Sequence, residues 1–395
     1  MGFIGVVTAI GLAEEGNRVI CVDIDKNKID MLRNLKLSFS EPGLEEKLKN
    51  DKINKLLEFT TDLNYAIANS NISFICVGTP PNPDRTINLE YIKKLYSSIS
   101  KLIKPKSPPH IFVNRSTALP GTVEELIIPI LEKGSGLKEG KNFHVCSNPE
   151  FMREGCMVND FLFPEVIVIG GNDIKALNRV ETTYGQVAKR AKFVYKVDYK
   201  VAEMTKYAFN CYLVTKISFA NEIGLISDQL GIDGRKVMDI LQTDERIMIA
   251  KSYLNPGYAY GGSCLPKDPP AIINYSKIKG YKPVFFESII KLNDFVFKRA
   301  LKLIIGLCGD LNGKHISVFG VAFKKDTSDI RESRVIDLIC ELIKQNAQIS
   351  IVDPLAISET KKLLGSKVSY PVTIEDALKD SDICILGLAY EEFSQ

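Results

Sequence analysis

The sequence predicts an α/β fold in which two doubly wound parallel-sheet domains are joined by a long central helix. Short apolar runs alternate with charged amphipathic stretches in both halves of the chain. Because the runs are continuously apolar, they indicate strands of a parallel sheet that is buried on both faces. Residues 199–230, between the halves, contain no proline and are typical of one helix. With 395 residues, the chain is also too long for one ordinary domain.

The first domain is expected over residues 1–198. Gly2 and Gly5 have the spacing of the last two glycines of G-x-G-x-x-G, and a helical pattern then leads to Asp23. This order is typical of a dinucleotide site, but helix-packing glycines and a strand-terminal aspartate explain it equally well. The first glycine and the strand before it are not in the sequence, so we expect the domain to lack its first strand. The strands are predicted at RVICVD (18–23), ISFICVG (72–78), PHIFVNRS (109–116), FHVCSNPE (143–150) and EVIVIGG (165–171).

A central helical domain is expected over residues 199–295, and a second α/β domain over residues 296–395. A helical pattern runs from Pro283 to Cys308, and GDLNG (309–313) is a plausible linker. The sequence stops just after a predicted strand, so we expect the closing helix of this domain to be missing. The strands are predicted at KHISVFGVAF (314–323), QISIVDP (348–354) and SDICILGLAY (381–390).

The composition excludes several classes of protein. The 51 Lys and Arg residues nearly balance the 48 Asp and Glu residues, which argues against a partner that is nucleic acid or a membrane surface. No apolar run reaches the roughly 18 residues of a membrane span, and the start lacks a signal-peptide pattern. The nine cysteines form no C-x-x-C pair, which suits a reducing cytoplasm. With only three histidines, none near another, no metal site is expected.

Polar residues follow several predicted strands at the carboxyl edge, where open α/β sheets bind ligands. Thr79 lies in the turn after the second run, and Ser116 and Thr117 follow the third. Glu150 follows the fourth run, and Glu154 comes four residues later, which on a helix would place both carboxylates on one face. These side chains could bind a ligand or act as general bases. They could equally form loops, caps and a charged first helical turn.

The long helix carries polar residues on an apolar stripe. Lys206, Asn210 and Asn221 fall within roughly 60° of one another at 3.6 residues per turn. Buried polar groups need partners, so we expect these three to face a ligand or to hydrogen-bond another helix. Lys200 and Lys216 lie off the stripe and are expected to be solvated.

The strongest local signal is the segment NPGYAYGGSCLPKDPPA (255–271). Its glycines would let the backbone approach a ligand closely. Cys264 is in no apolar run, and it is expected at a helix start, where backbone amides favour a thiolate. Lys267 and Asp268 follow within one turn and could influence that thiolate or a substrate proton. The alternative is a glycine-rich connector with an incidental cysteine.

A basic loop, VAFKKDTSDIRES (321–333), leaves a predicted strand of the second domain. Phe323, Lys324 and Arg331 give it the character of a phosphate-binding loop. An ordinary solvated loop between a strand and a helix remains the alternative.

Taken together, these segments resemble the UDP-glucose/GDP-mannose dehydrogenase family from Gly2 to about Glu392. A set of motifs in one order is far more specific than any single motif. The resemblance implies two Rossmann-like domains around a central dimerisation helix. The motifs are GFIGV, CVDID, EPGL, GTP, STALPGT, NPEFMREG, EMTKYAFN with KISFANEIG, GYAYGGSCLPKD and FKKDTSDIRES.

The resemblance implies that NAD-dependent oxidation turns the C6 hydroxymethyl group of a nucleotide sugar into a carboxylate, with transfer of four electrons. Asp268, or a water held by Lys206 and Asp268, would remove the hydroxyl proton. Cys264 would capture the aldehyde as a thiohemiacetal, which a second oxidation turns into a thioester. Glu150 would assist water attack, with Thr117 and Asn210 holding the water and Lys206 stabilising oxyanions.

The resemblance also assigns binding residues by motif position. Gly2 and Gly5 would hold the pyrophosphate of NAD, Asp23 and Lys28 its ribose, and Thr79, Thr117 and Arg331 the rest of the cofactor. Arg246 would reach the substrate of a partner subunit in a homodimer built on the long helix. The nucleotide sugar would contact Phe151, Met152, Lys206, Asn210, Tyr253, Gly261, Phe323 and Lys324.

The motifs divide on which sugar is bound. RSTALPGT, ELIIPILEKGSGLKEG, GIDGRKVMD and SCLPKD are similar to GDP-mannose dehydrogenases, whereas DERI and FKKDTSDIRES are similar to UDP-glucose dehydrogenases. We therefore expect GDP-mannose first and UDP-glucose as the alternative. The segment FPEV also departs from the family, because Val166 stands where relatives carry an arginine. An inactive truncated fragment and a two-electron hydroxyacid-type dehydrogenase are competing interpretations.

Overall fold

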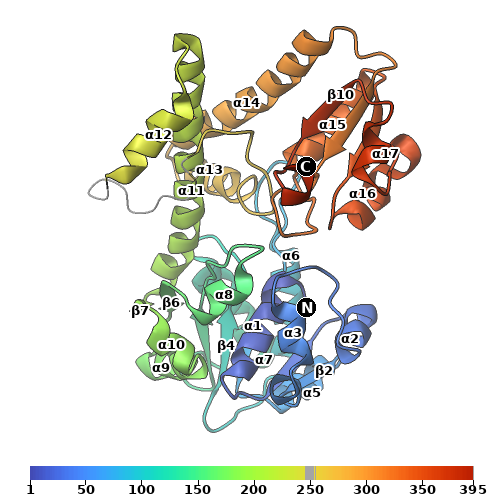
Figure 1. The fold of residues 1–395 in the computed structure, drawn as a ribbon. Helices are drawn as coiled ribbons and strands as arrows, with labels where there is room; N and C mark the ends of the chain where they lie inside the picture. The colour runs from blue at the N-terminus through green and yellow to red at the C-terminus, as the bar shows by residue number, and fades with distance from the viewer. Residues whose placement is uncertain (245–252, 254, 395) are drawn as a thin grey trace. The chain divides into compact units, whose positions relative to one another are not determined.

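The computed structural model describes residues 1–244, 253 and 255–394 (Figure 1). The chain divides into two compact units, Met1–Ala208 and Phe209–Gln395. In the described part of the chain, no helix is long and apolar enough to cross a membrane.

The first unit contains parallel strands in two sheets. The predicted strands at 18–23, 72–78, 109–116, 143–150 and 165–171 are confirmed as β1, β3, β4, β5 and β6. Strands β1 and β2 form a separate pair, and the other five have the order β3-β4-β5-β6-β7, in which only the β5–β6 pair is antiparallel. The bounds are β1 Val19–Val22, β2 Leu57–Thr60, β3 Ile72–Ile75, β4 His110–Asn114, β5 Phe143–Ser147, β6 Val166–Gly170 and β7 Phe193–Val197.

Helices surround these sheets in the first unit (Figure 1). Helix α1 packs very closely against α8, because a Cβ added at Gly11 would lie 2.2 Å from the ring of Phe161. Only glycine allows this approach. The bounds are α1 Phe3–Glu14, α2 Lys26–Arg33, α3 Leu44–Lys49, α4 Asp51–Asn54, α5 Leu63–Ala68, α6 Glu90–Ser100, η1 Val123–Ile127, α7 Ile128–Ser135, α8 Met157–Leu162, α9 Ile174–Thr183 and α10 Gln186–Arg190.

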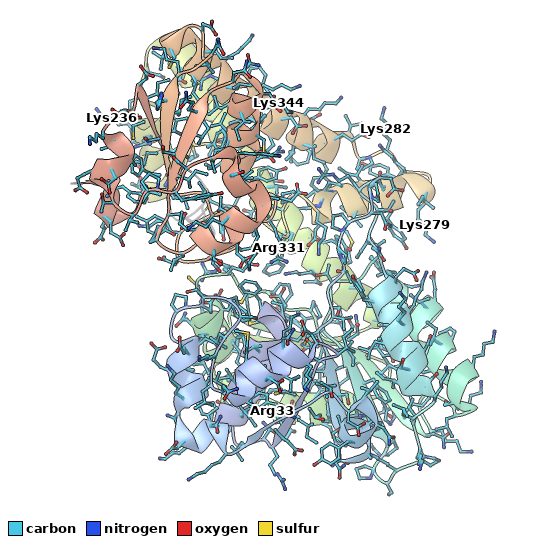
Figure 2. The ribbon with its side chains drawn as sticks, turned by 90° about the vertical axis from the view of Figure 1, so that its right-hand side faces the viewer. Arg33, Lys236, Lys279, Lys282, Arg331 and Lys344 are labelled. Atoms are coloured by element: carbon cyan, nitrogen blue, oxygen red, sulfur yellow. The ribbon has the colours of Figure 1, made fainter. Side chains whose placement is uncertain are left out.

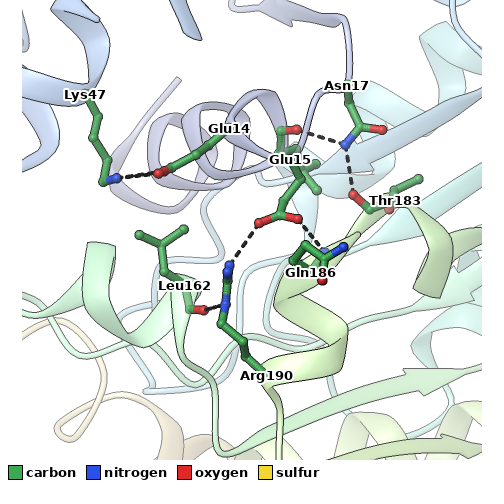
Figure 3. A network of polar contacts seen from close by, with 9 residues as sticks. Glu14, Glu15, Asn17, Lys47, Leu162, Thr183, Gln186 and Arg190 are labelled. Atoms are coloured by element: carbon green, nitrogen blue, oxygen red, sulfur yellow. Dashed lines mark hydrogen bonds and ion pairs between the residues drawn. The ribbon is translucent and has the colours of Figure 1, made fainter. Parts of the chain in front are cut away.

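A polar network fastens the end of α1 to later parts of the first unit (Figure 3). Glu15 accepts a hydrogen bond from the guanidinium of Arg190 at 2.9 Å and from the backbone amide of Gln186. Asn17 donates to the carbonyl oxygen of Thr183 at 2.9 Å, and Lys47 pairs with Glu14 at 2.7 Å. These contacts fix the orientation of α1, whose first turn is the predicted pyrophosphate-binding element.

The second unit contains the rest of α11 and a three-stranded parallel sheet of order β10-β8-β9. Helix α11 is continuous from Tyr199 to Leu230, as the sequence predicts, and passes from the first unit into the second. The three predicted strands are confirmed as β8, β9 and β10. The bounds are α12 Gly234–Thr243, α13 Asp268–Ile278, α14 Val284–Cys308, β8 His315–Phe319, α15 Arg334–Lys344, β9 Gln348–Val352, α16 Ile357–Leu364, η2 Gly365–Lys367, α17 Ile374–Leu378, β10 Ile383–Leu386 and η3 Glu391–Ser394.

Glu203, on the first turns of α11, caps the loop that contains Thr117. Its carboxylate accepts hydrogen bonds from the backbone amides of Gly121 at 2.6 Å and Val123 at 2.9 Å. The side chain is buried, and burial raises the pKa of Glu203 to about 7, against the partial opposition of these two bonds.

Replacing Glu203 with glutamine is expected to change how the stability of the protein depends on pH. The folded state keeps the proton of Glu203 up to about pH 7, whereas the unfolded chain loses it near the ordinary glutamate pKa of 4.5. The folded state therefore binds more protons in this window, and the stability that Glu203 contributes falls as the pH rises from 4.5 to 7. Urea unfolding across this pH range should show that the free energy of unfolding falls less steeply with pH in Glu203→Gln than in the parent. Equal slopes for parent and variant would contradict the assignment, with exposed Glu46→Gln as the control for a lost carboxylate.

Candidate active site

The predicted site residues form two groups, one in each unit. In the first unit, Asp23, Thr79 and Thr117 follow the carboxyl ends of β1, β3 and β4. The Asp23 carboxylate accepts a hydrogen bond from the amide of Asp25 at 2.9 Å, pairs with the amino group of Met1, and lies 3.9 Å from the Nζ of Lys28. Burial alone would raise the pKa of Asp23, but these bonds and charges together lower it. Asp23 is therefore held as an anion that can accept hydrogen bonds from hydroxyl groups.

The glycines at the start of α1 are not required by the packing of the chain. Gly2 is the N-cap of α1, and a Cβ added to it would meet no atom within 4 Å. A Cβ on Gly5 would make ordinary contacts, the closest at 3.6 Å from the Cβ of Cys76. The tight contact on this helix is made instead at Gly11, where α1 packs against Phe161 of α8. The first turn of α1 remains suited to a phosphate, since its amide groups have no intrahelical acceptor.

The two hydroxyl residues after β4 have different surroundings. Ser116 donates to the carbonyl oxygens of Ile75 at 3.2 Å and Val77 at 2.7 Å, so it ties the loop to β3. Ser116 therefore stabilises the loop, which is the alternative to ligand binding that the sequence left open. Thr117 is half-buried, and Thr79 is buried at the end of the neighbouring strand.

Glu150 and Lys206 form a buried ion pair in the first unit. The Nζ of Lys206 donates to Oε1 of Glu150 at 2.9 Å, and the amide of Met152 donates to Oε2 at 2.7 Å. The two side chains are 8% and 5% exposed. Burial alone would raise the pKa of Glu150, but the Lys206 ammonium and the Met152 amide hold it below its usual range. The Nζ of Lys206 also lies 5.9 Å from the ring centre of Phe151.

The helical interpretation of Glu150 and Glu154 is wrong. Residues 148–153 form an irregular turn, and α8 begins only at Met157. Asn148 and Pro149 direct the chain out of β5 without starting a helix, because proline fixes its own φ and disfavours helical backbone in the residue before it. Glu150 is therefore placed by this turn and by its bond to Lys206.

In the second unit, Cys264 precedes α13 by one turn. The helix begins at Asp268, later than expected, and the backbone carbonyl of Cys264 accepts hydrogen bonds from the amides of Lys267 at 3.0 Å and Asp268 at 2.8 Å. Cys264 is half-buried, and its Sγ lies 3.6 Å from the Oγ of Ser263. Asp268 is fully buried, with Nδ2 of Asn210 at 2.5 Å from Oδ2 and Nζ of Lys267 at 3.4 Å from Oδ1. A thiol and a carboxylate are thus held in one segment, and the amide of Asn210 on α11 binds the carboxylate.

Gly261 and Gly262 pack against the loop that follows β8. A Cβ on Gly261 would lie 2.3 Å from the carbonyl oxygen of Glu332. Gly262 has a φ of +92°, and a Cβ there would lie 2.6 Å from the ring of Phe323. The amide of Gly262 donates to the carbonyl of Glu332 at 3.3 Å. The described structure therefore explains these glycines by contact between two loops of the second unit.

Replacing Gly261 with alanine is expected to destabilise the second unit by about 1–3 kcal/mol, because the new methyl group overlaps backbone that cannot move freely. Gly257→Ala is the matched control, since a Cβ there would meet nothing within 4 Å. Urea unfolding of the two variants measures the difference. Equal stabilities would show that the contact with Glu332 does not constrain position 261.

The basic loop after β8 is held by the carboxylate of its own Asp329 and by that of Asp353, which follows β9. Arg331, labelled in Figure 2, donates from Nε to Oδ2 of Asp329 at 2.8 Å, and the amide of Phe323 donates to the carbonyl of Asp329 at 3.0 Å. The Nζ of Lys324 lies 5.9 Å from the ring centre of Phe323. Asp353 accepts a hydrogen bond from the amide of Val321 at 2.7 Å. Asp353 was not predicted from the sequence, although it ends the run QISIVD just as Asp23 ends the run VICVD.

The polar stripe of α11 is buried, as predicted, and each member has a polar partner. Lys206 bonds Glu150, Asn210 bonds Asp268, and Oδ1 of Asn221 accepts from the amide of Gly257 at 2.7 Å. The expectation that Lys216 is solvated is wrong: it is 6% exposed. Its apolar stem is long enough to lie along the packed helix.

Tyr253 and Arg246 are the remaining predicted substrate contacts. Tyr253 has a left-handed φ of +67°, which is unusual for a bulky residue and can mark a functional constraint. Arg246 lies outside the described residues.

Three comparisons with known proteins agree. Models of the UDP-glucose/GDP-mannose dehydrogenase family match the NAD binding domain over residues 1–188, the central domain over 200–295 and the UDP binding domain over 317–395. GDP-mannose 6-dehydrogenase of Pseudomonas syringae pv. syringae is 35% identical over 403 residues, which cover 100% of this chain and 90% of the relative. UDP-glucose 6-dehydrogenase TuaD of Bacillus subtilis is 36% identical over 394 residues, covering 100% and 83%.

Among solved structures, a UDP-glucose dehydrogenase from the hyperthermophilic archaeon Pyrobaculum islandicum is similar with a TM-score of 0.93 and 34% identity. The match covers 99% of this chain and 89% of that one. Because the family's NAD binding domain is present, NAD is the cofactor of this protein. The resemblance found in the sequence is confirmed: this chain belongs to the UDP-glucose/GDP-mannose dehydrogenase family.

Proposed function

We propose that this protein oxidises the C6 hydroxymethyl group of GDP-mannose to a carboxylate, with the consumption of two NAD⁺. The observation that carries the proposal is two groups of side chains: the buried pair of Glu150 with Lys206, and the half-buried Cys264 near the buried pair of Asp268 with Asn210. They supply a carboxylate base, a cation and a thiol nucleophile, which are the groups that a double oxidation through a covalent intermediate requires.

The first oxidation needs a base for the hydroxyl proton. Asp268, or a water held by Asp268 and Lys206, takes this proton while hydride leaves C6. NAD⁺ supplies the hydride acceptor in both oxidations. The Lys206 ammonium stabilises the negative charge that develops on the oxygen.

The second oxidation passes through Cys264. Its Sγ attacks the aldehyde carbon and forms a thiohemiacetal, whose oxidation gives a thioester. Water, activated by Glu150 and held by Thr117 and Asn210, then attacks the thioester carbonyl. The C–S bond breaks, the uronate leaves and the thiol is restored.

The residues at the first sheet edge fit NAD. Asp23 is an anionic acceptor suited to ribose hydroxyls, and Gly2 and Gly5 leave the first turn of α1 open to a pyrophosphate. Lys28, Thr79, Thr117 and Arg331 are proposed to complete the cofactor contacts. The nucleotide sugar is proposed to contact Phe151, Met152, Tyr253, Gly261, Phe323 and Lys324, with Arg246 from a partner subunit.

UDP-glucose is the second candidate substrate. The segments DERI and FKKDTSDIRES favour it, and relatives named for each of the two sugars are nearly equally similar to this chain. The test is the amount of NADH formed per molecule of GDP-mannose or UDP-glucose consumed. Two NADH per sugar supports the proposal and identifies the substrate. One indicates a two-electron dehydrogenase, and none with either sugar contradicts both candidates.

We also propose a homodimer built on α11. This helix has exposed apolar side chains at helical spacing, an arrangement that favours burial against a partner. Sedimentation equilibrium measures the mass directly, and a monomer at micromolar concentration would contradict the proposal. The side chains are Val201, Met204, Tyr212 and Phe219.

A further inference from the structure

Arg115, which follows β4, is a buried cation that sequence reasoning did not identify. Its side chain is 6% exposed, and its Cζ lies 6.0 Å from the ring centre of Phe161. Its Nη1 donates to Oδ1 of Asn148 and to the hydroxyl of Tyr184, both at 2.7 Å. A buried guanidinium is costly to retain, so its partners indicate what it does.

Of the two residues that Arg115 binds, Asn148 begins the turn that ends in Glu150. Its amide donates to the carbonyl of Asn114 at 2.9 Å, and its Nδ2 donates to the carbonyl of Val168 at 2.8 Å. Both bonds are buried, and Asn148 itself is 1% exposed. Pro149 then restricts the chain further. The position of Glu150 therefore depends on how Asn148 is fixed as well as on the bond to Lys206.

The charged groups around Glu150 are cations. Lys206 and Arg115 both favour its ionised form, and another titratable neighbour, the Cys76 thiol, has its pKa raised to about 11 by burial. Cys76 therefore stays neutral through the range in which an enzyme is assayed. In the described part of the chain, the hydrogen bonds of the Arg115 side chain go to neutral groups only.

We propose that Arg115 is a positioning residue for Glu150: it fixes Asn148, and through the Asn148–Pro149–Glu150 turn it holds the Glu150 carboxylate against Lys206. The inference rests on the proposed function, in which Glu150 activates water. Arg115 itself touches neither water nor substrate in this assignment. It acts by keeping the Glu150 carboxylate in place, because a small displacement of a catalytic base lowers the reaction rate strongly.

Arg115→Met is the principal test. We expect kcat for uronate formation to fall roughly 10- to 100-fold, with KM for NAD⁺ and sugar within about two-fold of the parent. The acid limb of the pH–kcat profile should move to higher pH, because Glu150 loses a nearby cation and its fixed orientation. Arg115→Lys keeps the charge but offers Asn148 a single flexible donor, so both effects should be smaller and in the same direction.

Arg179→Met is the matched control. Arg179 donates to the carbonyl of Pro109 at 2.9 Å, beside the opposite end of β4, and its replacement is expected to leave kcat and the acid limb unchanged. Parental kcat and acid limb in Arg115→Met would overturn the proposal. An equal loss of kcat in Arg179→Met would also overturn it, because it would show that removing any arginine beside β4 lowers activity. If Arg115→Met fails to fold, the Arg115→Lys variant decides, and a parental profile there overturns the proposal.

A measurement without turnover separates this proposal from the proposed function. Carboxylate ¹³C NMR titration, with Glu150→Gln for assignment, reports the pKa of Glu150 directly. A rise in Arg115→Lys, which keeps the charge, supports the positioning role even if neither sugar is oxidised, whereas an unchanged value in Arg115→Met overturns it even in an active enzyme.

Discussion

Replacing Cys264 with alanine is expected to reduce uronate formation by roughly three orders of magnitude or more, because the thioester route then has no nucleophile. The first oxidation does not use the thiol. The variant should therefore still bind NAD⁺ and nucleotide sugar with nearly parental affinity. The measurement is uronate released per enzyme, together with NADH formed in a single turnover.

The structure offers a matched control for this change. Cys384 is exposed and lies on β10 of the same unit, so Cys384→Ala removes a thiol without removing the proposed nucleophile. It should retain parental activity. A Cys264→Ala protein that made uronate at the parental rate would exclude a covalent intermediate on this residue.

The sequence predicted strands best where both faces of the strand are covered. Strands β4 and β5 are buried along their whole length and were found as continuous apolar runs. Strands β2 and β7 were missed because their sequences, LEFT and FVYKV, mix polar with half-exposed apolar residues and give no such run. The antiparallel β5–β6 pair was also missed, since strand direction depends on the connection through α8 and leaves no local signal.

Residues of the candidate site could be predicted where a local feature of the sequence, such as helical spacing, restricts the role of the residue. Helical spacing predicted the buried stripe of Lys206 and Asn210, and the absence of an apolar run distinguished Cys264 from other cysteines. The partners were not predictable in the same way, because Glu150 and Lys206 are far apart in sequence and meet only through tertiary folding. The same reason explains why Arg115 and Asp353 were missed.

The glycines show the limit of a motif most clearly. Gly5 has the motif position associated with close helix packing, but it is Gly11 that the ring of Phe161 excludes from having a side chain. Gly261 has the appearance of a ligand-binding glycine, whereas its nearest constraint is the carbonyl of Glu332. The position of a glycine in a motif predicts the helix or loop in which it lies, but it predicts only in part why the residue is glycine.

Replacing Glu150 with glutamine is expected to arrest the reaction at the thioester. Glutamine keeps the shape of the side chain and can still accept a hydrogen bond from Lys206, but it cannot take a proton from water. Hydrolysis should slow by roughly 10²- to 10⁴-fold, whereas both oxidations proceed. Intact-protein mass spectrometry should then detect an acyl adduct on Cys264 after a burst of two NADH per active site.

The pH dependence of the parent follows from the same carboxylate. Lys206 holds the pKa of Glu150 below its usual range, so the base is ionised at neutral pH and activity should be lost only on the acid side, as Glu150 becomes protonated. Glu150→Gln should lack this acid limb in the hydrolysis step.

The controls for Glu150→Gln separate chemistry from stability. Removing the charge of Glu150 leaves the Lys206 ammonium buried without its carboxylate, a change that can cost about 3–5 kcal/mol, so unfolding of the variant must be measured beside its kinetics. Glu154→Gln removes a neighbouring carboxylate outside the proposed machinery and should turn over normally without an adduct. If Glu150→Gln is folded and hydrolyses the thioester at the parental rate, another group activates the water, and the ion pair with Lys206 would then serve to hold the turn after β5 in place.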